Sequence, residues 1–370
     1  MALTQRLIAF DTVNPPGQEE PCARLLAELL AQAGFMVELV PLSEGRASLL
    51  ARKGAAGPRG PLVFTGHLDV VPLGGAPWSQ PPFGGQIVGD RLYGRGSSDM
   101  KGGIAAFVAA AIEEAHRASE NMALVLIITA GEETGCDGAQ SIVAAGLQGA
   151  AGALIVGEPT ANRPFVGHKG ALWLRCVACG KTAHGSMPEA GDNAVYKAAR
   201  ATQRLSLFNF GIQPHPVLGG PTLNVGTFHG GININSIPDR ATIEVDMRTI
   251  PGMAHGPLRE QVTQALGEPM EVHTLIDLPG VWTSPEQPWV QRSAAIISEI
   301  TGEPFELRTA TFFSDAAVLV PALGGVPTLI LGPGEPHLAH QTDEWCSLER
   351  LHQAKDIYRR LIIDWADTGN

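Results

Sequence analysis

MALVLIITAGEE, residues 122–133, is the stretch of the chain that says most about its fold. Residues 122–130 form a continuous apolar run, which is typical of a strand buried on both faces of a sheet. Two adjacent carboxylates, Glu132 and Glu133, follow it directly. Residues 101–118 before the run and 137–145 after it have the spacing of helices. This alternation predicts an α/β fold with a mostly parallel sheet and helices on both faces.

Polar side chains follow two further apolar strands in the same way. Residues 61–65 run into GHLD, residues 66–69, and residues 153–156 run into Gly157 and Glu158. The carboxyl ends of parallel strands meet at one edge of a sheet, where α/β proteins form their sites. Strand ends are also where chains turn polar, but that explanation suits one or two such residues better than five. The pattern therefore predicts one site that contains His67, Asp69, Glu132, Glu133 and Glu158.

Near residue 168 the continuous apolar strands give way to strands that alternate apolar and polar residues, and near residue 280 the first pattern returns. Strand-like alternation and helical spacing follow each other between these points, at residues 171–178, 193–207, 241–247 and 254–266. This order predicts a small α+β insert with one exposed sheet face. We therefore expect a catalytic domain made of residues 1–167 and 279–370, and an inserted domain made of residues 168–278.

Composition excludes several classes of protein. The 370 residues carry 26 Lys and Arg against 37 Asp and Glu, a formal net charge of −11, so no basic excess is available to bind nucleic acid or an anionic membrane. No apolar run reaches the roughly 18 residues of a membrane-spanning helix. The five cysteines are too few, and odd in number, for a disulfide framework, and residues 1–10 lack the features of a signal peptide. We therefore expect a cytoplasmic protein.

Each motif taken alone is ambiguous. A His67-x-Asp69 pair suits a zinc site, where a carboxylate holds the second imidazole nitrogen, but a structural role is the more common explanation. The glycine-rich loop 94–103 lacks the Walker spacing, and its Asp99 would repel a phosphate. Glu132 and Glu133 repel each other unless a cation lies near, although a solvated loop also tolerates such a pair. Of the three, the adjacent glutamates point most directly to a metal ion.

Five segments together resemble a known family. They are FTGHLDVVP (64–72), GRGSSDMKGG (94–103), AGEETG (130–135), GEPT (157–160) and AHQTDE (339–344). In this order they resemble the metallopeptidases and amidohydrolases that include acetylornithine deacetylase, succinyl-diaminopimelate desuccinylase, aminoacylase-1 and glutamate carboxypeptidase. The resemblance extends from about Leu7 to about Ile362. It implies a zinc-exopeptidase-like catalytic domain and, for the insert, a lid and dimerisation domain.

The resemblance also implies two divalent metal ions per chain, usually Zn²⁺, with Co²⁺ or Mn²⁺ as alternatives. His67 and Glu158 would hold one ion. Glu133 and His340 would hold the other, and Asp99 would bridge the two. Three protein ligands for each ion leave a position for water, which is typical of catalytic zinc sites.

Two further roles follow from the same resemblance. Asp69 would orient His67, and Glu132 would be the general base that takes a proton from the attacking water and passes it to the leaving nitrogen. His337 is an alternative to His340 as the last ligand. The family pattern favours His340, because it places the ligand three residues before an Asp-Glu pair.

The insert carries three residues that match functional positions of the family. His184 would stabilise the oxyanion, often in the active site of a partner subunit, and Asn235 lies in a second matching segment. Arg248 would bind the substrate carboxylate, although a structural ion pair with Asp246 or Asp239 is the alternative. We therefore expect a homodimer. Cys136 and the Ser314-Asp315 pair receive no role from the sequence.

The expected activity is hydrolysis of an N-acyl amino acid to the free amino acid and a carboxylic acid. A metal-dependent dipeptidase, aminopeptidase or carboxypeptidase is the alternative, because the same site would serve a different substrate pocket. A relative that binds an amino-acid derivative without catalysis is a third hypothesis, which the complete ligand set disfavours. In each case the partner is a small molecule or short peptide.

Overall fold

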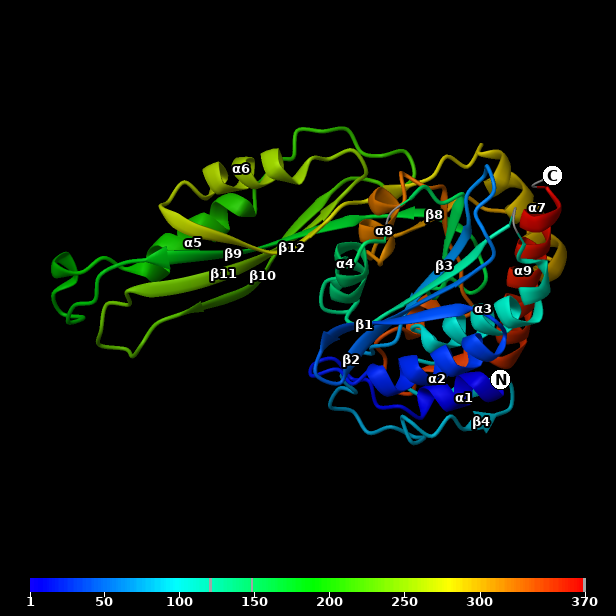
Figure 1. The fold of residues 1–370 in the computed structure, drawn as a ribbon. Coiled ribbons are helices and arrows are strands. Elements are labelled where there is room, and N and C mark those ends of the chain that lie inside the picture. The colour runs from blue at the N-terminus through cyan, green and yellow to red at the C-terminus, as the bar shows by residue number, and fades with distance from the viewer. Residues whose placement is uncertain (120–121, 148, 369–370) are drawn as a thin grey trace. The chain divides into compact units, whose positions relative to one another are not determined.

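The computed structural model describes residues 1–119, 122–147 and 149–368 (Figure 1). The chain forms two compact units. The first consists of Met1–Gly167, Trp282–Thr309 and the chain from Ser314, and the second consists of His168–Val281 and Ala310–Phe313. The second unit is larger than the predicted insert of residues 168–278. It includes Ala310–Phe313 because Lys169 N donates to Ala310 O at 3.1 Å and the Phe313 ring packs edge-on against Trp173.

A nine-stranded sheet runs through the first unit. Its strands are β1 (Met36–Ser43), β2 (Arg46–Lys53), β3 (Leu62–His67), β6 (Leu124–Thr129), β7 (Ala153–Val156), β8 (Phe165–His168), β13 (Val281–Trp282), β14 (Arg308–Ala310) and β15 (Thr328–Ile330). The order is β1-β2-β6-β3-β7-β15-β8-β13, and β14 pairs with β8. β3 is parallel to β6 and β7, and β7 is parallel to β15. β2 is antiparallel to β1 and β6, and β8 is antiparallel to β15. The predicted α/β fold is confirmed, with the parallel strands at the centre of the sheet.

Helices cover both faces of this sheet (Figure 1). One group, packed together, consists of α1 (Ala2–Ile8), α2 (Glu20–Gln32), α3 (Lys101–Glu113), α7 (Pro288–Thr301) and α9 (Leu348–Asp367). On the other face, α4 (Asp137–Ala144) contacts α8 (Ala316–Ala322). All six residues of β6 are buried, and Leu124, Leu126 and Ile128 belong to the core shared with α2, α3 and α9. Successive side chains of a strand point to opposite faces, so the apolar run serves both layers.

The second unit has its own antiparallel sheet. The strands are β9 (Gly170–Cys179), β10 (Thr222–Gly230), β11 (Arg240–Thr249) and β12 (Met270–Leu278), in the order β10-β11-β9-β12. Two helices, α5 (Ala194–Leu205) and α6 (His255–Leu266), pack on it. Ala241, Ile243, Val245 and Met247 of β11 are buried in a core that includes both helices, while the alternate residues are more exposed. Asn193 caps α5 by accepting hydrogen bonds from two of its first backbone N–H groups.

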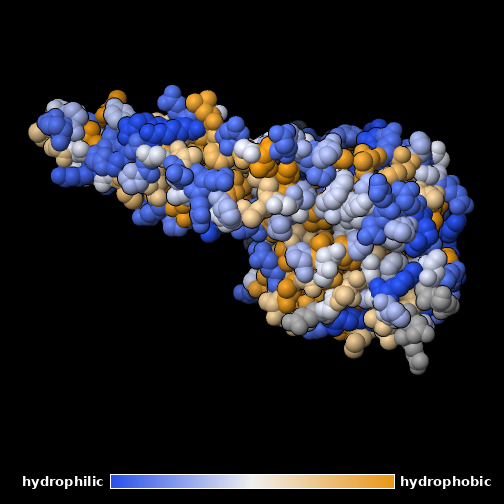
Figure 2. All heavy atoms as spheres, turned by 90° about the horizontal axis from the view of Figure 1, so that it is seen from above, coloured by the Kyte–Doolittle hydropathy of each residue, from blue (hydrophilic) through white to orange (hydrophobic). Residues whose placement is uncertain are grey.

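The remaining elements are short. β4 (Ile87–Val88), β5 (Arg91–Tyr93) and β16 (Trp345–Ser347) form a three-stranded sheet in the order β16-β5-β4. Single 3₁₀ turns occur at Ala115–Arg117, Pro188–Ala190 and Pro336–Leu338. Figure 2 shows hydrophilic and hydrophobic residues interspersed over the face in view. Among the described residues, no helix has both the length and the apolar character needed to cross a membrane.

Candidate metal centre

Three neighbouring parallel strands bring their polar ends to one edge of the large sheet. His67 is the last residue of β3, opposite Thr129 of β6. Glu132 and Glu133 follow β6, and Glu158 follows β7, which pairs with the other side of β3. The strand order β6-β3-β7 therefore places these four side chains together, as the sequence predicts.

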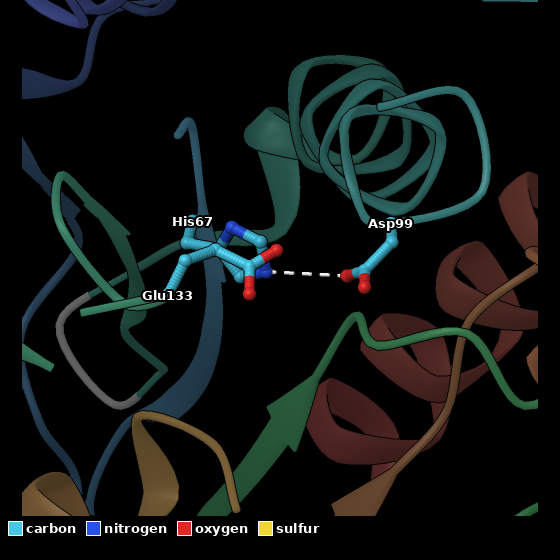
Figure 3. Close-up of side chains that lie close together, drawn as sticks. All are labelled: His67, Asp99 and Glu133. Atoms are coloured by element: carbon cyan, nitrogen blue, oxygen red, sulfur yellow. Dashed lines mark ion pairs between the residues drawn. The ribbon is translucent and has the colours of Figure 1, made fainter. Parts of the chain in front are cut away.

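Asp99 joins this cluster from the glycine-rich loop that precedes α3. Figure 3 shows His67, Asp99 and Glu133 converging from three different segments, and each offers a ligand atom within 4.8 Å of the others. Asp99 Oδ1 lies 3.3 Å from His67 Nε2, and Asp99 Oδ2 lies 3.4 Å from His340 Nε2. Asp99 Oδ1 is buried without a hydrogen bond from any described residue. A buried carboxylate oxygen without a hydrogen bond, close to an imidazole nitrogen, is an acceptor position that suits a metal ion.

The other two predicted ligands, Glu158 and His340, each lie next to a residue of this cluster. His67 Nε2 is 3.8 Å from Glu158 Oε1, and His340 Nε2 is 3.2 Å from Glu133 Oε1. His67, Asp99 and Glu133 form one potential metal-binding group, and Glu158 and His340 lie next to members of it. His337, the alternative to His340, is exposed, and its Nδ1 faces Glu335 at 3.8 Å.

Asp69 is hydrogen-bonded to the segments that carry the predicted ligands. Its carboxylate accepts hydrogen bonds from the backbone N–H groups of Glu132 and Glu133, both at 3.1 Å, and from Asn14 Nδ2 at 2.9 Å. His67 Nδ1 bonds to the Asp69 backbone carbonyl at 2.9 Å, whereas the carboxylate lies 3.5 Å away. This bond fixes the proton of neutral His67 on Nδ1, which leaves the Nε2 lone pair for a metal. The Asp69 carboxylate mainly holds the loop that carries the two glutamates.

The electrostatics of the cluster show a shortage of positive charge. Burial raises the pKa of Glu132, Glu133 and Glu158, and neighbouring carboxylates raise each pKa further. Hydrogen bonds to Asp99 and Glu133 raise the pKa of His340 to about 10. Burial would raise the pKa of Asp99, but the imidazoles of His67 and His340 outweigh it and lower that pKa. Divalent cations relieve this kind of repulsion between carboxylates, so the residues present fit a metal centre.

Comparisons with known proteins place the chain in a family. The sequence model of peptidase family M20/M25/M40 matches residues 63–364. This chain belongs to that family. The resemblance recognised from the five motifs is thereby confirmed. Family membership makes the chain a metal-dependent hydrolase of amide bonds.

Individual members of the M20/M25/M40 family match most of the chain. The chain is 31% identical to an acetylornithine deacetylase from Edwardsiella ictaluri, over 98% of this chain and 96% of the relative. It is 29% identical to a probable succinyl-diaminopimelate desuccinylase from Staphylococcus epidermidis, over 90% of each. A metallo-carboxypeptidase from Sulfolobus solfataricus has a similar fold, with a TM-score of 0.81 at 18% identity over 98% of both chains. So does YxeP of Bacillus subtilis, described as a dinuclear metal-binding peptidase, with a TM-score of 0.74 at 14% identity over 99% and 97% of the two chains.

Sequence reasoning missed three residues that support this M20/M25/M40 site. Asn14 is buried and bonds to Asp69, but a lone amide far from any predicted strand end gives no signal. Arg95 and Glu344 lie within two of the family segments, yet nothing in their spacing shows that they meet. In the structure they form a buried ion pair with 2.7 Å between Nη1 and Oε2.

The three residues predicted from the insert lie in the second unit. His184 and Asn235 are exposed and close in the backbone, since Gly185 N donates to Asn235 O at 2.7 Å. Arg248 Nε lies 3.0 Å from Asp246 Oδ1, so the ion pair considered as its alternative role is present. The Arg248 guanidinium also faces the rings of Trp173 and Phe313 at 5.6 and 5.7 Å.

Cys136 and Asp315 are buried close to the segment that carries Glu132. Cys136 Sγ is 3.9 Å from Glu132 Oε1, and its backbone adopts a left-handed conformation with φ of 62°. Asp315 accepts a hydrogen bond from Thr129 Oγ1, and burial raises the pKa of Asp315 to about 6. Asp315 thus contacts the last residue of β6, three residues before Glu132.

Proposed function

We propose that this chain is a two-metal deacylase that hydrolyses the amide bond of an N-acyl amino acid. The Asp99 carboxylate supports the proposal most directly. One of its oxygens faces His67 at 3.3 Å and the other faces His340 at 3.4 Å. A carboxylate with an imidazole at each oxygen is suited to bridge two ions.

The remaining donors complete the two ligand sets. His67 and Glu158 would hold one ion, and Glu133 and His340 the other, each together with Asp99. These donors are nitrogen and oxygen atoms without a thiolate, which suits Zn²⁺, with Co²⁺ or Mn²⁺ as alternatives. When bound, the ions would polarise the scissile carbonyl and make water more acidic.

Glu132 is the proposed general base. Its carboxylate is buried beside the cluster, with Oε2 at 4.0 Å from His67 Nε2, and the two ligand sets do not need it. Its backbone is held by the Asp69 carboxylate. Glu132 would take a proton from the attacking water and deliver it to the leaving nitrogen, so that the amine departs neutral.

The deacylase assignment is supported by the two curated relatives described above. The deacetylase and the probable desuccinylase match this chain over at least nine-tenths of its length. Within the proposal, residues 168–278 act as a lid and dimerisation domain. His184 and Asn235 stabilise the oxyanion. Arg248 binds the substrate carboxylate, for which it must give up its ion pair with Asp246. A cytoplasmic homodimer belongs to the same proposal.

Glu132→Gln tests the mechanism. We expect the variant to bind two ions and to lose activity by about 10²–10⁴-fold, the usual range for removal of a general base. Chelation should silence the wild-type enzyme, and Zn²⁺ or Co²⁺ should restore it. Measurements are metal content and kcat/KM on N-acetyl amino acids, N-succinyl amino acids and dipeptides. Near-full activity of the variant contradicts the role of Glu132, and hydrolysis of dipeptides alone supports the peptidase alternative.

A further inference from the structure

Glu344 is a completely buried carboxylate that accepts four hydrogen bonds from one loop. Oε2 accepts from Arg95 Nη1 at 2.7 Å and from Gly96 N at 3.0 Å. Oε1 accepts from Ser98 N at 2.8 Å and from Asp99 N at 3.0 Å. All four donors belong to the glycine-rich loop, and the last of them is the backbone of the shared ligand itself.

Arg95 connects the same loop to the segment that carries His340. Its guanidinium is 1% exposed, and besides Glu344 it donates to Gln341 O and to Pro72 O, both at 3.2 Å. A planar guanidinium with several fixed donors holds such partners in one geometry. Glu344 and Arg95 therefore join the residues around Asp99 to those directly after His340.

The ligands differ in how the fold positions them. His67 and Glu158 lie at the ends of β3 and β7, which the backbone ladder of the sheet holds in place. Asp99 and His340 both lie in loops, and His340 is half-exposed in a left-handed conformation with φ of 64°. The sheet does not determine the distance between these two side chains. The side chains of Glu344 and Arg95 join the two loops close to the ligands, in addition to the pairing of β16 with β5 and the hydrogen bond from Ser98 Oγ to Trp345 O at 2.7 Å.

We propose that Glu344, together with Arg95, is a positioning residue of the metal centre that fixes Asp99 relative to His340. The proposal rests on the two-metal function proposed above. The ion held by Glu133, His340 and Asp99 depends on this contact more than the ion held by His67, Glu158 and Asp99. Loss of the Glu344 carboxylate should therefore weaken one of two binding events and largely spare the other.

Glu344→Gln is the direct test. The glutamine side chain has only one acceptor oxygen. Its NH₂ group would therefore face N–H donors that in the wild type donate to the second oxygen of the Glu344 carboxylate. We expect the wild-type protein to bind two Zn²⁺ ions, and the variant to bind the first nearly as well and the second about 10–100-fold more weakly. The chelator-treated proteins are titrated with Zn²⁺ alone by calorimetry, and the bound zinc is counted by elemental analysis. Excess Zn²⁺ should restore kcat.

Glu114→Gln is the matched control. Glu114 is 3% exposed and accepts from Arg117 Nε at 2.8 Å and Arg359 Nη2 at 2.9 Å, but it lies at the far end of α3 from the metal ligands. We expect it to bind both ions as the wild type does. Equal loss of the second ion in both variants, or no loss in Glu344→Gln, overturns the positioning role. A wild-type protein that binds fewer than two ions overturns the two-metal function instead.

Arg95→Lys provides a second variant in case Glu344→Gln does not fold. Lysine keeps the positive charge beside Glu344 but cannot hold Gln341 O and Pro72 O at the same time. We expect weaker binding of the second Zn²⁺ in the same direction as for Glu344→Gln, with a smaller factor. An unchanged affinity for the second ion in a folded Arg95→Lys protein overturns the proposal.

Discussion

His168 is an imidazole whose protonation is controlled by burial. The residue is completely buried, Nδ1 donates to Lys169 O at 2.8 Å, and Nε2 has no hydrogen-bond partner among the described residues. A proton on Nε2 would be a buried charge without a partner, so burial lowers the pKa of His168 to about 4. The pKa in the folded state is thus below the unfolded value of about 6.5. The stability from this group is present above pH 6.5 and is lost as the pH falls through 4.

His168→Asn should remove this pH dependence, because an amide can donate to Lys169 O and does not titrate. The free energy of unfolding of the wild type is expected to fall by about 3 kcal/mol more than that of the variant between pH 7 and pH 4. Urea unfolding of the chelator-treated proteins measures both values. The same change at the exposed His352 should leave the wild-type dependence intact. Parallel curves for wild type and His168→Asn would show that His168 is not held neutral.

Single residues of the site differ in how far the sequence predicts them. The acids and imidazoles that follow β3, β6 and β7 could be found because each comes after an apolar run. Glu344 and Asn14 could not. Their contacts depend on loop paths that bring partners together over 245 residues for Glu344 with Asp99 and over 55 residues for Asn14 with Asp69. Three of the four hydrogen bonds that the Glu344 side chain accepts come from backbone N–H groups, and every residue type except proline can donate these.

Among the elements, the central strands and the four predicted helices, which correspond to α3, α4, α5 and α6, were predicted within a few residues, and the edge strands of the second unit were missed. β10 and β12 are the two edges of their sheet. Each has a register shift, between Val225 and Thr227 in β10 and between Thr274 and Ile276 in β12. A bulge breaks the two-residue period, and an edge strand buries fewer side chains, so the apolar alternation that marks β11 is interrupted in both strands.

Helix α6 is attached to the sheet of the second unit through its first residue. His255 Nε2 lies 2.8 Å from Thr249 Oγ1, and His255 Nδ1 lies 2.6 Å from Asp277 Oδ1. This order of hydroxyl, imidazole and carboxylate is that of a hydrolase triad. Thr249 is completely buried, however, so its hydroxyl cannot meet a substrate. The network instead joins α6 to β11 and β12.

His255→Ala should therefore destabilise the second unit. Two hydrogen bonds are lost and the buried Thr249 hydroxyl keeps no imidazole partner, so we expect a decrease in the free energy of unfolding of about 1–3 kcal/mol. Denaturant unfolding followed by circular dichroism measures it. Thr249→Ser keeps the hydroxyl and should have a smaller effect. An unchanged free energy of unfolding for His255→Ala would contradict a structural role, and Zn²⁺ binding should not change in either variant.

At the scale of the whole molecule, the two units have separate hydrophobic cores, and only the first contains the proposed metal ligands. The core of the first includes α2, α3, α9 and the parallel strands, and the core of the second includes α5, α6 and the antiparallel sheet. The change of pattern near residue 168 marks the start of the second unit in the sequence. Its end could not be predicted in full, because Ala310–Phe313 return to it from far along the chain through contacts with Lys169 and Trp173.

Metal binding should stabilise one unit and leave the other unchanged. All the proposed ligands lie in the first unit, and a ligand that binds only the folded state adds about 2.7 kcal/mol when its concentration is 100 times Kd. Because each unit has its own core, we expect two transitions in calorimetric melting, of which Zn²⁺ raises one and His255→Ala lowers the other. Calorimetric melting of the wild type and of His255→Ala, each as chelator-treated and as Zn²⁺-loaded protein, assigns the two transitions to the two units. A Zn²⁺-induced rise confined to the transition that His255→Ala lowers would contradict the location of the ligands, because ions held only by residues of the first unit cannot stabilise the second core alone.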